Sequence, residues 1–125
     1  MSENIVLTTG IYDLIKDQIR RKKVTLEEEE ILKVRLKNAV QLTRKNLPED
    51  VVTIDAKTTI KNHNNNQEES YTFVAPDKAK KRNNTESIIS PMGLAIMGTK
   101  VRDKVKWKFN EEEVELEILN VERIA

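Results

Sequence analysis

The sequence is poor in several residue types that often carry chemistry. Its 125 residues include no cysteine, one histidine, three glycines and three prolines, and only 4% are aromatic. Without cysteine there is no disulfide framework, no thiolate zinc site and no cysteine nucleophile. The segment before Thr8 carries Glu3 and a short apolar run, Ile5 to Leu7, which fits neither a signal peptide nor a membrane span. We therefore expect a cytoplasmic protein that does not engage a membrane.

An excess of charge of one sign is also missing. Lysine and arginine number 22, aspartate and glutamate 21, and the net charge is +1. Proteins that coat nucleic acids are strongly basic, so we expect no direct sequence-specific nucleic-acid binding. Charged residues nevertheless make up 34% of the chain, above the ~25% typical of globular domains. Any electrostatic recognition must therefore come from local patches.

The motifs of common enzyme classes are absent. There is no G-x-G-x-x-G, no Walker sequence and no H-E-x-x-H. The single histidine, His63, lies in an asparagine-rich run with no nucleophile or orienting carboxylate beside it in sequence, and we expect it to be solvated. The sequence therefore predicts a binding protein that is not an enzyme and needs no cofactor.

Two helices are predicted before Pro48. The first begins after Thr8 or Thr9, and the second runs from about Leu26 to Asn46, where Pro48 prevents continuation. The apolar faces are Ile11, Leu14, Ile15 and Ile19 in the first helix, and Leu32, Leu36, Ala39, Val40 and Thr43 in the second. A tight turn near Val24 makes residues 1–47 an antiparallel helical hairpin, a short coiled coil.

The predicted hairpin turn carries opposite charges on its two sides. A basic run, residues 20–23, ends the first helix, and four glutamates, residues 27–30, begin the second. Thr25 and Glu28 have the spacing of a capping box, and acids suit the amino end of a helix. Clustered carboxylates are also possible Mg²⁺ ligands, although the neighbouring cations would pair with them. The candidate tip residues are Arg20, Arg21, Thr25, Glu27 and Glu28.

After Pro48 the apolar period changes from 3.6 to 2, which predicts a compact antiparallel β domain over residues 48–125. Strands are expected at 52–61, 70–75, 87–89, 104–110 and 114–124, with a turn at 62–66 and a bulge near Leu119 and Asn120. One short apolar helix should lie across the sheet. Ser90 caps it, Pro91 occupies its first position and Gly98 ends it. The overall class is α+β.

The loop over residues 76–84 is basic, with Lys78, Lys80, Lys81 and Arg82. Such a loop can meet phosphates or an acidic protein surface. It lacks the interleaved aromatic residues that stack on bases in single-strand binders. We expect it to be a solvated loop.

Two stretches of the β domain carry a distinctive combination of residues. Residues 47–54 read Leu-Pro-Glu-Asp-Val-Val-Thr-Ile. Residues 87–98 read Ser-Ile-Ile-Ser-Pro-Met-Gly-Leu-Ala-Ile-Met-Gly and are followed by Val101, Asp103, Val105 and Trp107. The first resembles P-x-D-V-V-T-M/L and the second S-P-x-G-x-A-L-L-G-x-x-V-G-D-x-V/I-x-W of the GreA/GreB transcription-factor family. With a closing strand at 116–121, the resemblance covers residues 47–123. It is closest to the short-armed Rnk branch (regulator of nucleoside diphosphate kinase).

The resemblance implies an FKBP-like β domain with a coiled-coil arm that binds RNA polymerase at the entrance of its secondary channel. We expect a monomer. The polymerase-binding residues that it implies are Ser90, Pro91, Met92 and Gly93. The sequence departs from the family pattern at Arg102, where glycine is usual, and at Ile89, where an acid is frequent. The departure at Arg102 concerns the geometry of a turn, and the departure at Ile89 concerns the docking surface.

In cleavage-stimulating members of the family, two tip acids of a long arm deliver Mg²⁺ to the polymerase active site. The family tip pattern D-L-S-E-N-A-E-Y reads Thr-Leu-Glu-Glu-Glu-Glu-Ile-Leu here, at residues 25–32. A first helix of about 14 residues spans only ~20 Å, so we expect an arm that obstructs the channel and competes with other channel factors.

Two alternatives remain open. Glu27 and Glu28 could form a working acidic tip that stimulates transcript cleavage. Peptidyl-prolyl isomerisation is suggested by the FKBP-like fold alone, which does not carry function, and the 4% aromatic content argues against an aromatic-lined proline pocket.

Overall fold

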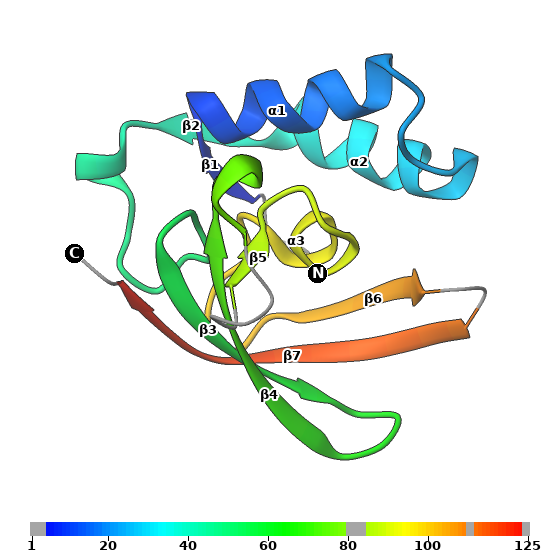
Figure 1. Cartoon of the computed structure of the whole chain (residues 1–125), viewed down its shortest axis with the longest axis vertical. Helices are drawn as coiled ribbons and strands as arrows, with labels where there is room; N and C mark the ends of the chain where they lie inside the picture. The colour runs from blue at the N-terminus through cyan, green and yellow to red at the C-terminus, as the bar shows by residue number, and fades with distance from the viewer. Residues whose placement is uncertain (1–4, 80–84, 110–111, 124–125) are drawn as a thin grey trace. The chain divides into compact units, whose positions relative to one another are not determined.

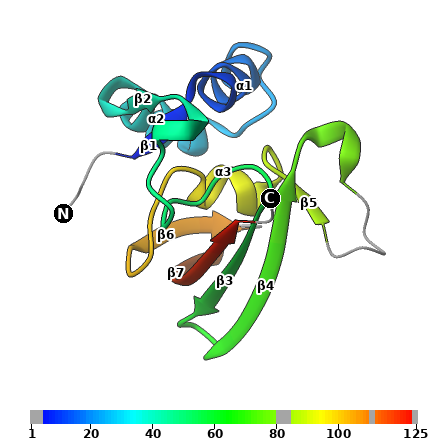
Figure 2. The ribbon, with the colours of Figure 1, turned by 90° about the vertical axis from the view of Figure 1, so that its left-hand side faces the viewer.

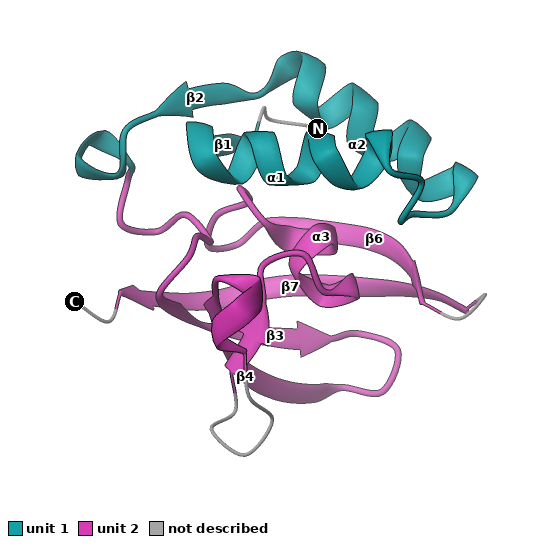
Figure 3. Ribbon diagram, turned by 45° about the horizontal axis from the view of Figure 1, so that its top comes forward, with its two compact units in different colours: residues 1–47 teal, residues 48–125 magenta. Residues whose placement is uncertain are grey.

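The computed structural model of the protein describes residues 5–79, 85–109 and 112–123. The chain divides into two compact units, residues 1–47 and 48–125 (Figure 3). The class is mixed α+β, as predicted, with a curled β-sheet and few helices. None of the helices in the described residues has the length and apolar character needed to cross a membrane.

Unit 1 contains two helices that pack side by side and are joined by a tight turn (Figure 1). Helix α1 is Thr9–Arg20 and helix α2 is Leu26–Asn38. The Thr8 side chain accepts a hydrogen bond from the Ile11 N–H and caps α1. The buried side chains are Ile11, Ile15 and Ile19 of α1 and Glu29, Leu32 and Leu36 of α2. The 3.6-residue period therefore predicted the buried positions of α1, apart from half-buried Leu14, and Leu32 and Leu36 of α2, but it missed Glu29.

The second helix is shorter than predicted. It ends at Asn38, and the segment expected to continue it forms strand β2, Val40–Leu42, and a 3-10 turn, η1, Arg44–Asn46. Strand β2 pairs in parallel with β1, Val6–Thr8, and the Val40 N–H donates to the Ile5 carbonyl at 2.9 Å. The helical spacing of Val40 predicted a buried position on a helix, and this was wrong. Val40 lies in an extended strand and is 44% exposed.

Unit 2 is a five-stranded sheet in the order β5-β4-β3-β7-β6. The strands are β3 Ala56–Asn62, β4 Gln67–Val74, β5 Thr85–Ser87, β6 Lys104–Phe109 and β7 Glu112–Arg123. The neighbours pair antiparallel except for β4 and β5, which pair in parallel. The prediction of a purely antiparallel sheet was therefore wrong at this edge. After β4, the chain passes through the 3-10 turn η2, Pro76–Lys78.

The sheet curls around helix α3, Pro91–Ile96 (Figure 2). The largest fully buried side chains of this unit come from both layers: Phe73, Ile88, Ile96, Met97, Trp107, Leu116 and Ile118. Gly98, at φ 88°, ends the helical segment in the left-handed conformation that its position predicted. Helix and sheet together enclose one modest core.

The first strand of the sheet begins at Ala56, four residues later than predicted. Val52 is buried but pairs elsewhere: its N–H donates to the Thr99 carbonyl at 2.7 Å, and the Gly98 N–H donates to the Val52 carbonyl. Asp55, at φ 59°, turns the chain into β3. The alternation of apolar and polar residues continues through this turn, so the pattern could not show where the strand begins.

The bulge predicted near Leu119 and Asn120 is confirmed. Thr59 of β3 pairs with Asn120 of β7, whereas Ile60 pairs with Ile118, which leaves Leu119 as the extra residue. On the other side of β7, three lysines of β6 stand opposite three glutamates: Lys104 opposite Glu117, Lys106 opposite Glu115 and Lys108 opposite Glu113. Opposite charges in cross-strand register favour this pairing, and lysines protect an edge strand from pairing with other chains.

Arg102 stands where the sequence pattern that the chain resembles has glycine, and its backbone adopts a left-handed conformation. Its φ is 81°, its N–H donates to the Ile118 carbonyl at 2.7 Å, and the turn is closed by an Asp103 N–H bond to the Lys100 carbonyl. The turn therefore forms with arginine at position 102, but its backbone is strained, since the left-handed region costs a residue with a Cβ roughly 1–2 kcal/mol.

Arg102→Gly should raise the free energy of unfolding by roughly 0.5–1 kcal/mol, because relief of the left-handed strain exceeds the extra freedom of glycine in the unfolded chain. Urea unfolding monitored by Trp107 fluorescence measures the change. Arg102→Ala is the matched control, since it removes the side chain but keeps the strain, and it should stay within about 0.5 kcal/mol of the parent. A gain with Ala as large as with Gly would contradict the strain argument.

Candidate functional site

The turn between α1 and α2 forms the hairpin tip, residues 20–29. Helix α1 ends in a Schellman motif, in which the Lys22 N–H bonds the Ile19 carbonyl and the Lys23 N–H bonds the Gln18 carbonyl. Lys22 takes the left-handed position at φ 57°. The motif reverses the chain within a few residues and sets α2 beside α1.

Two of the predicted tip residues, Arg20 and Arg21, pair with Asp17 of the same helix. Arg20 forms an ion pair with one carboxylate oxygen, and Arg21 Nη1 lies 3.4 Å from the other. The hydrogen bond from Arg20, followed by the charges of both arginines, lowers the pKa of the Asp17 carboxyl. The tip arginines are thus partly balanced by an acid from their own helix.

The predicted capping box is confirmed. Thr25 Oγ1 accepts from the Glu28 N–H at 3.1 Å, and Glu28 Oε1 accepts from the Thr25 N–H at 3.0 Å. One predicted tip acid, Glu28, is therefore bound to the backbone of its own helix start. Glu27 stands exposed beside Leu26, whose side chain is 78% exposed.

Glu29 is the tip carboxylate that the sequence analysis did not single out. It is only 9% exposed, and it forms ion pairs with Lys33 Nζ at 2.8 Å and Lys22 Nζ at 3.8 Å. The hydrogen bond from Lys33, and then the charges of both lysines, lower the pKa of the Glu29 carboxyl. The i, i+4 spacing to Lys33 was a signal available in the sequence, but the pairing with Lys22 depends on the fold of the turn.

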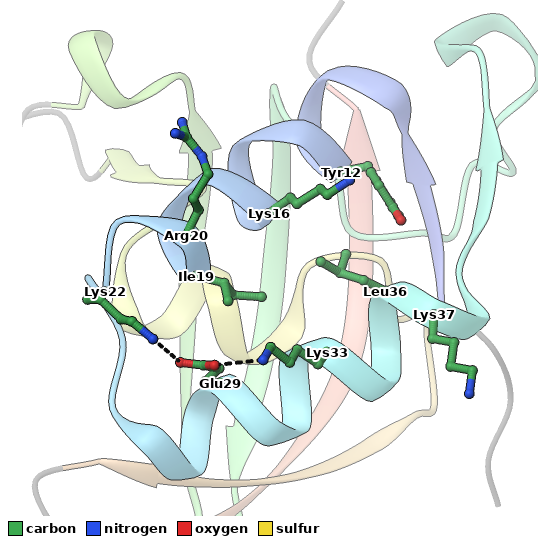
Figure 4. Close-up of a pocket in the computed structure, with 9 residues that line it drawn as sticks. All are labelled: Tyr12, Lys16, Ile19, Arg20, Lys22, Glu29, Lys33, Leu36 and Lys37. Carbon is green, nitrogen blue, oxygen red and sulfur yellow. Dashed lines mark ion pairs between the residues drawn. The ribbon is translucent and has the colours of Figure 1, made fainter.

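A groove of about 520 Å³ lies between α1 and α2 (Figure 4), and we name it the hairpin groove. It is lined by Tyr12, Lys16, Ile19, Arg20, Lys22, Glu29, Lys33, Leu36 and Lys37. Ile19 and Leu36 lie between the helices, while Lys22 and Lys33 point toward Glu29. The sequence analysis missed this groove, because it did not relate the side chains of the two helices to each other.

The predicted polymerase-binding residues lie at the start of α3 and differ in exposure. Ser90 Oγ accepts from the Gly93 N–H at 3.1 Å, which confirms its capping role, and Pro91 is exposed in the first turn. Met92 is half-buried. Gly93 is buried, and a Cβ there would lie 2.7 Å from the Ser87 carbonyl oxygen and closer still to that of Ile88. Ser90 and Pro91 are thus the accessible part of this motif, whereas Gly93 permits close packing.

Met92 also lines a small hollow of about 40 Å³ on the curled sheet. The other lining residues are Ile60, Asn62, Asn65, Gln67, Glu69, Tyr71 and Leu116. Tyr71, the aromatic residue in this lining, donates a hydrogen bond to Glu69. Burial, and then that bond, raise the pKa of Tyr71. The lining mixes polar and apolar side chains and has one aromatic residue, unlike an aromatic-walled proline pocket.

His63 is not simply solvated, as we had expected. Its Nε2 lies 2.8 Å from Glu117 Oε1, and its backbone N–H donates to the Glu115 carbonyl. Asn64 makes two further hydrogen bonds to β7, so the β3–β4 turn is attached to the neighbouring strand.

The other candidate, the basic loop, is described only up to Ala79, and Lys80, Lys81 and Arg82 lie outside the described residues.

No group of three or more histidine, aspartate or glutamate side chains is arranged to hold a metal ion within residues 5–79, 85–109 and 112–123. Two glutamates of the tip are instead engaged separately. Glu28 caps the helix and Glu29 pairs with two lysines.

Comparisons with known proteins place these features in context. Residues 47–123 match the family model described as transcription elongation factor GreA/GreB, C-terminal. A transcription elongation factor GreA from Clostridium beijerinckii is 30% identical over 128 residues, which cover 98% of this chain and 80% of that protein. A regulator of nucleoside diphosphate kinase from Escherichia coli K12 is 28% identical over 92 residues, covering 73% of this chain and 68% of that protein.

The fold has a similar solved structure, a prokaryotic transcription elongation factor GreA/GreB from Nitrosomonas europaea. The TM-score is 0.68 at 18% sequence identity, and the superposition covers 97% of this chain and 99% of that one. At this level of identity the likeness concerns the fold.

Glu29→Gln should lower the free energy of unfolding at neutral pH and have little effect in acid. A carboxyl whose pKa is lowered in the folded state stabilises that state above its unfolded pKa, and the stabilisation disappears as the pH falls through the lowered folded value. The difference between parent and variant should therefore shrink as the pH drops below about 4.3, where an unperturbed glutamate titrates. Urea unfolding from pH 7 to pH 2 measures it. A difference independent of pH would show that the charge of Glu29 is irrelevant.

Proposed function

The chain belongs to the GreA/GreB transcription elongation factor family, and we propose that it binds RNA polymerase at the secondary channel as a regulator that is not itself catalytic. It would dock through its β domain, of FKBP-like type, and place its short coiled-coil arm at the channel mouth. Other factors that enter the same channel would be excluded while it is bound.

The length of the hairpin supports an obstructing arm. Helix α1 has 12 residues and α2 has 13, so neither exceeds about 20 Å at 1.5 Å per residue. The second helix is even shorter than the sequence predicted, because its last part forms β2. In the cleavage-stimulating members that the sequence resembles, the arm must be long enough to reach the catalytic centre.

The state of the tip carboxylates is the observation that carries the proposal. Delivery of Mg²⁺ requires carboxylate oxygens that are free to coordinate the ion. Here Glu28 accepts a hydrogen bond from the Thr25 backbone, and Glu29 is held by Lys22 and Lys33. A metal ion at this tip would have to compete with the chain's own donors and with nearby positive charge.

The start of α3 is the proposed docking surface. Pro91 is exposed and Ser90 half-buried, and both lie in the Ser-Pro motif within the matched residues 47–123. Ile89, where the family often has an acid, is half-buried, and its N–H donates to Ser87 Oγ. The docking proposed here therefore depends on shape and on the capped helix start, without a carboxylate at position 89.

Core RNA polymerase should be retained by the tagged protein in a pull-down, and retention should fall about tenfold or more in the double variant Ser90→Glu/Pro91→Ala, as expected when a central contact is removed. Asn120→Glu, which adds the same charge at an exposed position of β7, is the control and should bind like the parent. Circular dichroism establishes that the double variant is folded. Absence of polymerase from the eluate of the parent would end the proposal.

The alternative of a working acidic tip makes a different prediction. On stalled transcription complexes the protein should not stimulate transcript cleavage, whereas Clostridium beijerinckii GreA serves as the positive control. If cleavage does occur and Glu27→Ala/Glu28→Ala abolishes it, the acidic tip is functional and the obstructing role is wrong. Thr25→Ala controls for the loss of the helix cap, because it breaks the same capping box while leaving both acids in place.

A further inference from the structure

Helix α2 has apolar side chains on two opposite faces. Leu32 and Leu36 are buried on one of them. On the other face, Ile31 and Val34 are exposed, although aliphatic side chains of this size are usually found inside a protein. Residues three positions apart are neighbours on a helix surface, so Ile31 and Val34 form one apolar patch.

The exposed large apolar side chains are concentrated in this one segment. Over residues 5–79, 85–109 and 112–123 they are Leu26, Ile31, Val34 and Val40. Leu26 begins α2, and Val40 lies in β2 just beyond the end of the helix. Exposed apolar residues scattered over a surface are ordinary, whereas a concentration of them on one element indicates an interaction surface.

The exposed stripe of α2 reads the same in both directions. It consists of Glu27, Ile31, Val34 and Asn38, which are all exposed and follow the i, i+4, i+7, i+11 spacing of one helical face. We name this stripe the outer face of α2. Its order is polar, apolar, apolar, polar, and a second α2 that runs in the opposite direction presents the same order at the same spacing. A twofold interface between identical chains requires a surface that is complementary to itself in this way.

The charges of α2 are separated along its length. Its first half holds the four glutamates at 27–30, and its second half holds Lys33, Arg35 and Lys37. Glu30 and Lys37 are about two turns apart and border the outer face on the same side. Both are exposed, and neither side chain has an ion-pair or hydrogen-bond partner within the described part of the chain. Antiparallel pairing of two α2 helices places the acidic half of one beside the basic half of the other, whereas parallel pairing places like charges together.

We propose that the outer face of α2 binds the same face of a second copy of this chain, with the two helices antiparallel, in place of the monomer expected from the sequence. Ile31 of one copy packs on Val34 of the other, and Glu30 of one copy lies beside Lys37 of the other, so that each contact occurs twice. A helix of 13 residues is only about 20 Å long. The interface is therefore smaller than the roughly 1,200–2,000 Å² of stable complexes, and the dimer is weak and reversible.

Sedimentation equilibrium of the full chain alone tests the proposal without polymerase. Between about 10 μM and 1 mM protein, the average mass should rise from that of a monomer toward that of a dimer and go no further. Val34→Glu should weaken the association roughly tenfold or more, because it places a charge at the centre of the apolar contact. The control Asn120→Glu adds the same charge at an exposed position of β7 and should change the association constant less than about twofold.

Charge reversal tests the antiparallel direction. Glu30→Lys and Lys37→Glu should each weaken the association about fivefold or more at low ionic strength, because both cross-interface pairs then join like charges. The double variant Glu30→Lys/Lys37→Glu should associate like the parent, since opposite charges again face each other. In a parallel dimer, like charges already face each other in the parent, and neither single reversal would weaken the association.

NMR spectra of the parent at increasing concentration should show chemical-shift changes at the outer face of α2, which keeps the test valid if a variant fails to fold. The proposal is overturned if the parent stays monomeric at about 1 mM, if Val34→Glu and Asn120→Glu weaken the association equally, or if the single charge reversals leave it unchanged. A monomeric parent that loses polymerase in the pull-down through Val34→Glu would assign the outer face to polymerase and not to a second copy.

Discussion

Two of the glutamates that begin α2, Glu28 and Glu29, are held by donors of their own hairpin, and this constraint shapes the turn between the two helices. Glu28 closes the capping box with Thr25, and Glu29 joins the tip to α2 through Lys22 and Lys33. These contacts order the turn and fix α2 beside α1. Under the proposed function, these contacts matter because Glu28 and Glu29 are already bound to donors of the chain itself and would have to release them to coordinate a metal ion.

The turn before β6 forms although a residue with a Cβ occupies its left-handed position. Arg102 stands in the left-handed region, and its N–H still reaches the Ile118 carbonyl of β7. The turn is determined by the strands and loops around it, which hold the backbone against a cost of roughly 1–2 kcal/mol. By contrast, Gly93 has no freedom to change, because its neighbouring carbonyl groups fill the space of a side chain.

The near-neutral net charge of the chain hides a local separation of positive and negative side chains. Lysines and glutamates alternate in register between β6 and β7, so the charges on that face compensate each other. In the hairpin groove the cations outnumber the acid, and two of them have no partner among the described residues. The hairpin groove is therefore recognised from the local arrangement of charged side chains, which the net charge of the chain does not reveal.

Local signals in the sequence determined the caps of α1, α2 and α3, the buried isoleucines of α1, the stop at Gly98 and the bulge at Leu119, because each depends on residues a few positions apart. Only the tertiary structure decided that α2 ends early, that Asp55 turns the chain before β3, and that His63 is clamped to Glu117. It also brought Lys22 to Glu29 across the turn and set the residues of α1 and α2 that line the groove beside each other. These features arise between segments that are distant in sequence or through backbone conformations that alternation and helical spacing do not reveal.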